Sequence, residues 1–153
     1  MAYSIKKGRV AIVTGGASGI GKGICLGLAQ EGAYVAVADM DITGAQAVAD
    51  EIKAAGGEAM AVQVDVRTRE QCDAMVAAVV EKYGTVDILV NNAGLIRDAL
   101  IHKMTDEEWD IVVDVILRGA FMCTQAAIKV MKEKKYGRII NISAVGQMGY
   151  RGQ

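Results

Sequence analysis

The segment Thr14–Gly21 reads TGGASGIG, and the rest of the chain is organised around it. It follows a short apolar run, residues 10–13, and opens into a segment whose apolar residues recur at helical spacing. The local order is therefore strand, glycine turn and helix. Such a turn presents backbone N–H groups at a helix N-terminus, where partial positive charge favours a phosphate. Its glycines allow a tight reversal, close approach of a pyrophosphate, and close packing of the helix on the sheet.

An acidic residue stands at the distance from this turn that dinucleotide binding requires. Asp39 ends the next apolar run, residues 33–38, about 20 residues beyond the turn. A carboxylate at that place accepts hydrogen bonds from the hydroxyl groups of an adenosine ribose. The spacing of Gly15, Gly19 and Gly21 differs from the usual GxGxxG fingerprint. We expect dinucleotide binding, and a purely structural glycine turn is the alternative.

Length, composition and charge narrow the class of protein. The chain has 153 residues, 52% of them apolar, which suffices for one domain with a sizeable core. A net charge of −1, with acids and bases interspersed, predicts no nucleic-acid partner and no anionic-membrane partner. Residues 1–9 lack the apolar core of a signal peptide, and no uninterrupted apolar run has the length of a membrane span. We therefore expect a cytoplasmic protein that does not contact a membrane.

Cysteine and histidine, which are common metal ligands, form no metal-binding pattern in this sequence. Cys25, Cys72 and Cys123 lie far apart in the sequence, and each falls within a helical apolar pattern, so we expect buried reduced thiols. His102 is the only histidine. It stands in a polar loop without a nucleophile to activate, and we interpret it as a solvated residue. No metal is expected.

Apolar strands alternate with amphipathic helices along the whole chain. Near-continuous apolar strands indicate a parallel sheet that helices cover on both faces. The predicted fold class is α/β, a Rossmann-type doubly wound parallel sheet, with residues 1–153 as one domain. The sheet is expected to be incomplete on its C-terminal side, because the last helix and sixth strand of the full fold are lacking. Strands are predicted over residues 10–13, 33–38, 59–66, 86–90 and 138–142.

Helix boundaries follow from capping signals. Thr68–Gln71 and Thr105–Glu108 both read as capping boxes, and Gly32 is a typical helix stop. The second box opens a long helix whose inward face is predicted to carry Trp109, Val112, Val113, Ile116, Ala120 and Phe121.

The glycine turn, Asp39, the tetrapeptide NNAG at Asn91–Gly94 and the strand INIS at Ile140–Ser143 together resemble the short-chain dehydrogenase/reductase family. The resemblance runs from about Lys7 to the end of the chain. It implies an oxidoreductase that moves a hydride between NAD or NADP and the carbon of a ketone or secondary alcohol. The loop after NNAG is most similar to 3-oxoacyl-[acyl-carrier-protein] reductases, which implies a 3-oxoacyl thioester substrate, and small hydroxyketones stay open.

The same resemblance implies which residues form the site. Asp65 and Val66 would contact the adenine, and Ser143 would be the catalytic serine that hydrogen-bonds the substrate oxygen. The alternative for Ser143 is a serine that ends a buried strand and caps the next turn. All the expected residues follow the carboxyl ends of strands, where open parallel sheets bind ligands. The expected cofactor-binding residues are Gly15, Ser18, Gly19, Ile20, Gly21, Asp39, Asp65, Val66, Asn92, Ala93 and Gly94.

Charge predicts the choice between the two cofactors. A carboxylate at Asp39 accepts ribose hydroxyls but repels a 2′-phosphate, and neither the turn nor Met40 supplies an arginine to hold one. We therefore predict NAD over NADP.

Two features depart from the family pattern. The family's Tyr-x-x-x-Lys pair, which acts as general acid and base, is not found, and Tyr150 stands too close to Ser143 to match it. Ile116 occupies the place of an asparagine that orders a water in the family's proton relay. We expect the 153-residue chain alone to be inactive and the whole protein to be a homodimer or homotetramer. A nucleotide-binding protein without catalysis is the alternative.

Overall fold

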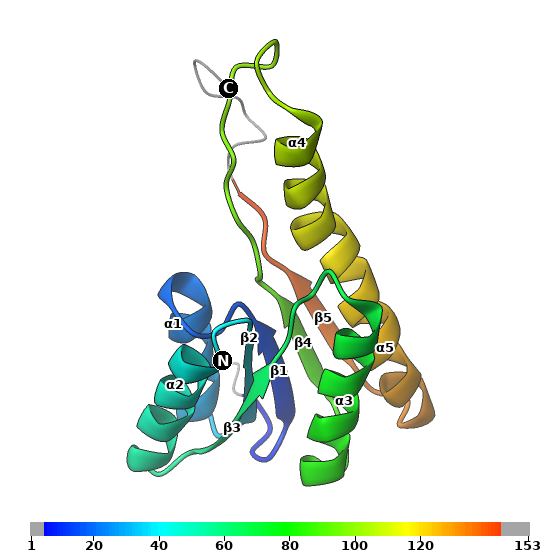
Figure 1. The fold of residues 1–153 in the computed structure, drawn as a ribbon. Helices are drawn as coiled ribbons and strands as arrows, with labels where there is room; N and C mark the ends of the chain where they lie inside the picture. The colour runs from blue at the N-terminus through cyan, green and yellow to red at the C-terminus, as the bar shows by residue number, and fades with distance from the viewer. Residues whose placement is uncertain (1–4, 145–153) are drawn as a thin grey trace.

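In the computed structural model, which describes residues 5–144, five parallel strands form one sheet with helices on both faces (Figure 1). The strand order is β3-β2-β1-β4-β5. Strands β2 and β3 lie on one side of β1, and β4 and β5 lie on the other, so the strand order switches between β1 and β4. The predicted α/β doubly wound fold is confirmed. The elements are β1 (Val10–Thr14), α1 (Gly19–Gln30), β2 (Tyr34–Asp39), α2 (Ile42–Ala54), β3 (Glu58–Gln63), α3 (Arg69–Tyr83), β4 (Ile88–Asn91), α4 (Asp106–Val113), η1 (Asp114–Arg118), α5 (Gly119–Glu133) and β5 (Arg138–Asn141).

The core forms two layers, one on each face of the sheet. Alternate residues of a strand point to opposite faces, so Ala11 and Val13 pack in one layer while Val10 and Ile12 pack in the other. Helices α1 and α2 cover the first face, and α3 and α5 cover the second (Figure 1). Burial on both faces explains why β1 is apolar at nearly every position.

One of the two predicted capping boxes forms and the other does not. At the start of α4 the Glu108 N–H donates to the Thr105 Oγ1 at 3.2 Å, and the Thr105 N–H donates to Glu108 at 3.0 Å. Thr68 makes no side-chain cap bond at the start of α3. There the Gln71 side chain instead accepts a 2.7 Å bond from the Asp65 N–H. The prediction at Thr68 was wrong because the preceding loop competes for Gln71.

Helices α4, η1 and α5 form one continuous run, Asp106–Glu133, and its predicted inward face was wrong. Trp109 and Phe121 are 58% and 57% exposed, and Ile116 is 43% exposed. The error has two causes. The helix carries apolar residues on all its faces, and the π-turn η1 shifts the register of its side chains by inserting one residue into a turn. The buried residues are instead Val115, Gly119, Met122, Cys123, Ala126, Ala127 and Met131.

The same helical run is long and apolar enough to cross a membrane, by length and composition alone. No other helix among residues 5–144 meets that criterion. One such helix is weak evidence, since one face of this helix packs in the core. The absence of a membrane partner stays a prediction.

Strand β5 forms the exposed edge of the sheet. It pairs with β4 alone within the described residues, and Ile140 is 45% exposed. The predicted incompleteness on this side of the sheet is confirmed for residues 5–144.

Candidate functional site

The glycine turn after β1 packs so closely that side chains are excluded from it. Gly15 and Gly19 have φ values of +65° and +52°, which favour glycine. A Cβ on Gly21 would overlap the carbonyl oxygen of Gly15 and lie 2.6 Å from Nδ2 of Asn92. The turn, the first residues of α1 and the end of β4 therefore form one interlocked unit.

The start of α1 presents backbone N–H groups to solvent. The Lys22 N–H donates to the Ser18 carbonyl at 3.0 Å, as in a regular helix. The N–H groups of the first helical residues precede that bond and have no partner within the helix. Ser18 makes no side-chain cap bond, and Ile20 is 70% exposed. The end of this helix is open to an anion.

Thr14 and Asn92 tie the turn to the NNAG segment. The buried Thr14 hydroxyl accepts the N–H groups of Asn92 and Ala93, each at 3.1 Å. In the other direction the Asn92 side-chain amide donates to the carbonyls of Thr14 and Gly15, at 3.0 and 3.1 Å. Asn92 thus fixes the shape of the turn itself. The prediction that Asn92 binds the cofactor did not include this structural role.

Asp39 is held in place by the backbone. One carboxylate oxygen accepts the Ala17 N–H and the other accepts the Asp41 N–H, both at 3.0 Å. Each oxygen keeps a second lone pair for a further donor. The carboxylate is therefore oriented at the carboxyl end of β2 before any ligand arrives.

These groups surround one cavity of about 500 Å³ at the carboxyl ends of β1 and β4. Of the predicted cofactor-binding residues, only Asp65 does not line it. Backbone N–H groups at a helix end, an oriented carboxylate and an apolar wall fit a nucleotide with a phosphate and a ribose. The lining residues that the sequence did not single out for this cavity are Met40, Val64, Leu95 and Val115.

Asp65 lies in an adjoining hollow of about 440 Å³, which shares Met40 with the larger cavity. The Arg67 guanidinium pairs with its carboxylate at 2.6 Å and holds the pKa of Asp65 below its usual range. No sequence pattern predicted this ion pair. Val66, the next residue, does line the main cavity.

Ser143 lines a second cavity, of about 410 Å³, beside β5 and the long helix. Three polar residues lie there together: the buried Asn91 amide donates to Thr124 at 3.1 Å and to Asn141 at 2.8 Å. Sequence reasoning missed this cluster, although Asn91 directly follows one predicted strand and Asn141 lies in another. In the structure the two residues end β4 and β5 and sit opposite one another in the register. Ile116 also lines this cavity and brings no polar group to it.

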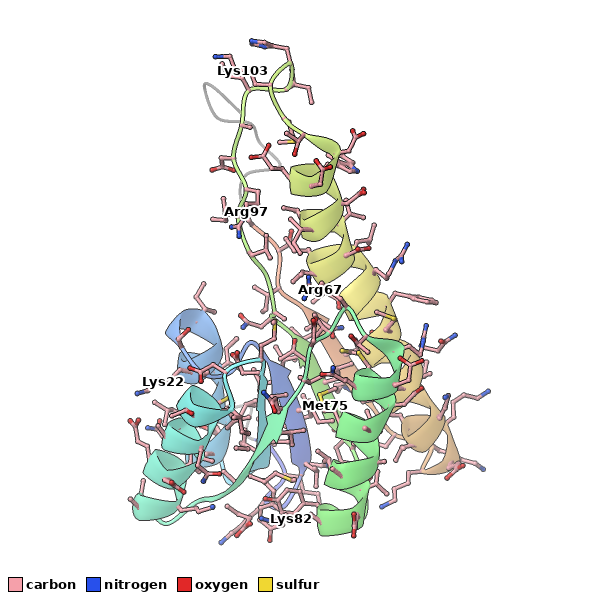
Figure 2. The ribbon with its side chains drawn as sticks, viewed as in Figure 1. Lys22, Arg67, Met75, Lys82, Arg97 and Lys103 are labelled. Atoms are coloured by element: carbon pink, nitrogen blue, oxygen red, sulfur yellow. The ribbon has the colours of Figure 1, made fainter. Side chains whose placement is uncertain are left out.

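His102 lines neither of these cavities. The segment after β4 extends away from the sheet, with Arg97 along it and Lys103 near its tip (Figure 2). His102 is exposed at this tip, as predicted. No group of three or more histidine, cysteine, aspartate or glutamate residues within 5–144 could hold a metal ion. Tyr150 lies outside the described residues.

Comparison with families of known proteins gives one match over most of the chain. Residues 9–153 match the short chain dehydrogenase family. A 3-oxoacyl-[acyl-carrier-protein] reductase of Synechocystis is 46% identical over 95% of this chain and 60% of its own length. The Staphylococcus aureus enzyme of the same name is 44% identical over 97% of this chain and 61% of its own. The BbsD subunit of a (2S)-[(R)-hydroxy(phenyl)methyl]succinyl-CoA dehydrogenase from Thauera aromatica is 40% identical, over 95% and 58%.

Comparison with solved structures also finds short chain dehydrogenases. The crystal structure of gox2181 superposes with a TM-score of 0.92 at 38% identity, over 95% of this chain and 58% of that one. A short chain dehydrogenase from Mycobacterium avium has a TM-score of 0.87 at 39% identity, over 92% and 53%. The chain thus spans about 60% of the length of the curated relatives that it matches.

Proposed function

The chain belongs to the short-chain dehydrogenase family of oxidoreductases, which use a nicotinamide cofactor, and we propose that it forms the NAD(H)-binding part of such an enzyme. The observation that carries the proposal is the gathering of the glycine turn, Asp39 and Asn92–Gly94 around one cavity. A proposed single domain, residues 1–153, contains all of these groups.

The residues present fit the cofactor. The N-terminus of α1 would hold the pyrophosphate, because its N–H groups face outward and the glycines leave room for close approach. Val66 and the NNAG segment would flank the adenosine, with Asp65 at its outer edge. When bound, the nicotinamide supplies a hydride donor or acceptor. The role of this part of the chain is to fix where that ring lies.

Asp39 supports NAD over NADP. Its oxygens are already oriented by two backbone N–H groups, so they accept ribose hydroxyls without rearrangement. A 2′-phosphate placed there would bring like charges together, and Met40 beside it offers no compensating cation. Arg67 is engaged by Asp65.

Titration of the chain with NADH and NADPH, followed by nicotinamide fluorescence, tests this proposal. We expect NADH to bind at least about tenfold more tightly, equivalent to about 1.4 kcal/mol. Asp39→Asn is expected to reduce that preference to about threefold or less. Asp41→Asn is the matched control, because Asp41 lies two residues away and caps α2 without lining the cavity. Equal dissociation constants for the two cofactors in the unsubstituted chain would contradict the NAD assignment.

For catalysis we propose Ser143 as the residue that donates a hydrogen bond to the substrate oxygen. Its hydroxyl lies at the carboxyl side of β5, in the cavity that adjoins the proposed cofactor site through Val66, Ala93 and Val115. A donor placed there stabilises the negative charge that develops on that oxygen. The names of the relatives support a 3-oxoacyl thioester as substrate, with small hydroxyketones as the alternative.

Kinetics of the whole protein test Ser143. Ser143→Ala is expected to lower kcat by about 100-fold or more, while the dissociation constant of NADH stays within about twofold. Ser143→Thr keeps a hydroxyl and serves as the control. Unchanged turnover in the alanine variant would leave Ser143 as a serine that ends a strand.

A second candidate is a nucleotide-binding protein without catalysis, favoured by Ile116. This side chain lines the Ser143 cavity and has no group that can hold a water. If whole-protein assays show NADH binding but no oxidation of NADH with acetoacetyl thioesters, diacetyl or cyclic ketones, the binding function stands. A gain of activity in Ile116→Asn would show that the missing polar group limits the rate.

We further propose a cytoplasmic whole protein that assembles as a homodimer or homotetramer. The exposed apolar residues Leu117 and Phe121 on the long helix support an interface at that face. Size-exclusion chromatography with light scattering measures the assembly directly.

A further inference from the structure

Two cysteines that lie 51 positions apart in the sequence meet in the core between α3 and α5. The sulfur atoms of Cys72 and Cys123 are 3.7 Å apart, and both side chains are fully buried. The Cys123 thiol donates to the Cys72 sulfur, and the Cys72 thiol donates to the Val66 carbonyl at 3.4 Å. The proposed function uses neither thiol.

A glycine lets α5 pack closely against the segment that precedes α3. A Cβ on Gly119 would lie 2.8 Å from Cγ2 of Val66, so only glycine lets α5 approach the segment between β3 and α3 this closely. Cys123 follows Gly119 by four residues and therefore lies on the same face, one turn further along. Helices α3 and α5 run side by side (Figure 1), and Cys72 stands in the first turn of α3.

The surroundings of the two thiols differ in a way that favours reaction at Cys72. The start of α3 favours a negative charge there, and Arg69 adds a positive one. The hydrogen bond from Cys123 holds the pKa of Cys72 below its ordinary value, whereas the same bond and burial raise the pKa of Cys123. Cys25, on the other face of the sheet, differs from Cys72, because burial raises its pKa to about 12.

We propose that Cys72 and Cys123 are a redox-active pair that a peroxide converts into an intramolecular disulfide bond joining α3 to α5. The Cys72 thiolate attacks one peroxide oxygen, the O–O bond breaks, and the departing hydroxide takes a proton and leaves as water. The Cys123 sulfur then attacks the Cys72 sulfur and gives up its proton to the departing hydroxyl group, the S–O bond breaks, and a second water leaves. Two thiols are oxidised and one hydrogen peroxide is reduced to two waters.

The distance between the two sulfur atoms favours the disulfide, and the burial of both thiols slows its formation. The sulfurs are already in contact and need to approach by only about 1.7 Å to reach a disulfide length near 2.05 Å. Neither thiol is exposed, so the oxidant enters only when α3 and α5 separate locally, which makes the reaction slower than that of a surface thiol. In the disulfide, Cys72 has no S–H group left to donate to the Val66 carbonyl.

Treatment of the purified protein with hydrogen peroxide in native buffer tests the pair. The intact mass is expected to fall by two hydrogen atoms, and the count of free thiols from three to one. Peptide mapping should recover Cys72 linked to Cys123, with Cys25 still open to alkylation after unfolding. Dithiothreitol should restore all three thiols, and the oxidised form should unfold at higher urea concentration, because the cross-link restricts the unfolded chain.

Two variants distinguish the proposed Cys72–Cys123 disulfide from nonspecific oxidation of the thiols. Cys25→Ser should form the same bridge as the unsubstituted protein. Cys123→Ser should form none and should leave Cys72 as a sulfenic acid that dimedone traps. A bridge that involves Cys25, or one that forms only in urea, would overturn the proposal. These readouts need no nucleotide, and the mapping of the unsubstituted protein stands even if a variant folds poorly.

Discussion

Strands β1 and β5 both lead to residues expected at the site, yet their surroundings are opposite. All five residues of β1 are buried, with β2 and β4 as its neighbours. In β5 no residue is fully buried, and β4 is its only neighbour within residues 5–144. One strand is fixed from every side, and the other forms an edge.

The difference separates the proposed binding site from the proposed catalytic residue. The cavity next to β1 gets its shape from contacts among Thr14, Gly21 and Asn92, all within the described residues. Ser143, beyond β5, is exposed, and few contacts define its surroundings. The proposed cofactor site is therefore preorganised, whereas Ser143 lies at an exposed edge of the sheet.

The largest effect is expected at the turn after β1. Gly21→Ala puts a methyl group onto the Gly15 carbonyl oxygen, so we expect a loss of about 3 kcal/mol in the free energy of unfolding. NADH affinity should fall with it. Gly23→Ala in the same helix is the control: nothing lies within 4 Å of its Cβ, and it should stabilise α1 by roughly 0.5–1 kcal/mol. Urea unfolding measures both. If the two variants behave alike, the turn is not preorganised as described.

A somewhat smaller effect is expected from the bond between β1 and the NNAG segment. Thr14→Val leaves the N–H groups of Asn92 and Ala93 without their acceptor, which should cost about 2 kcal/mol. Thr14→Ser keeps the hydroxyl and should recover most of that loss. Thermal and urea unfolding of the three proteins check this, and a valine variant as stable as the parent would contradict it.

One conservative change made in both strands compares them directly. Ile12→Val in β1 should cost about 1 kcal/mol, because the deleted methylene leaves a cavity in a fully buried layer. Ile140→Val in β5 removes the same group from a residue that is 45% exposed, and should stay within about 0.5 kcal/mol. Equal losses would show that β5 is covered in solution.

The smallest effect is expected at the exposed corner after β3. Arg67 lowers the pKa of Asp65, so the pair adds stability at pH values above the pKa of an unfolded aspartate, and this contribution is lost as the pH falls through the folded pKa. Arg67→Gln should cost less than about 1 kcal/mol at pH 7, since the pair is partly exposed. Urea unfolding should show that difference vanishing in acid. A difference that grows as the pH falls would contradict the ion pair.

Sequence patterns predicted the strands because short apolar runs bounded by turn residues are typical of buried parallel strands. They also selected residues that the structure brings to one cavity, all but Asp65 of the proposed cofactor residues, since parallel strands end at one edge. Apolar periodicity did not predict the buried face of the long helix, because this helix has apolar residues on all its faces. The capping pattern failed at Thr68 too, because the Asp65 N–H, a competing donor to the Gln71 side chain, is brought near it only once the loop is folded.

By itself the sequence determined the α/β class, the glycine turn and the carboxylate at Asp39, because all three depend on residues close together in the chain. The tertiary structure alone decided that Asn92 holds the turn, that Arg67 closes on Asp65, and that Cys72 meets Cys123. The turn and thiol contacts join residues more than 50 positions apart, and the ion pair depends on the loop conformation after β3. Distances of that kind are set by how helices pack on the sheet, which no local pattern records.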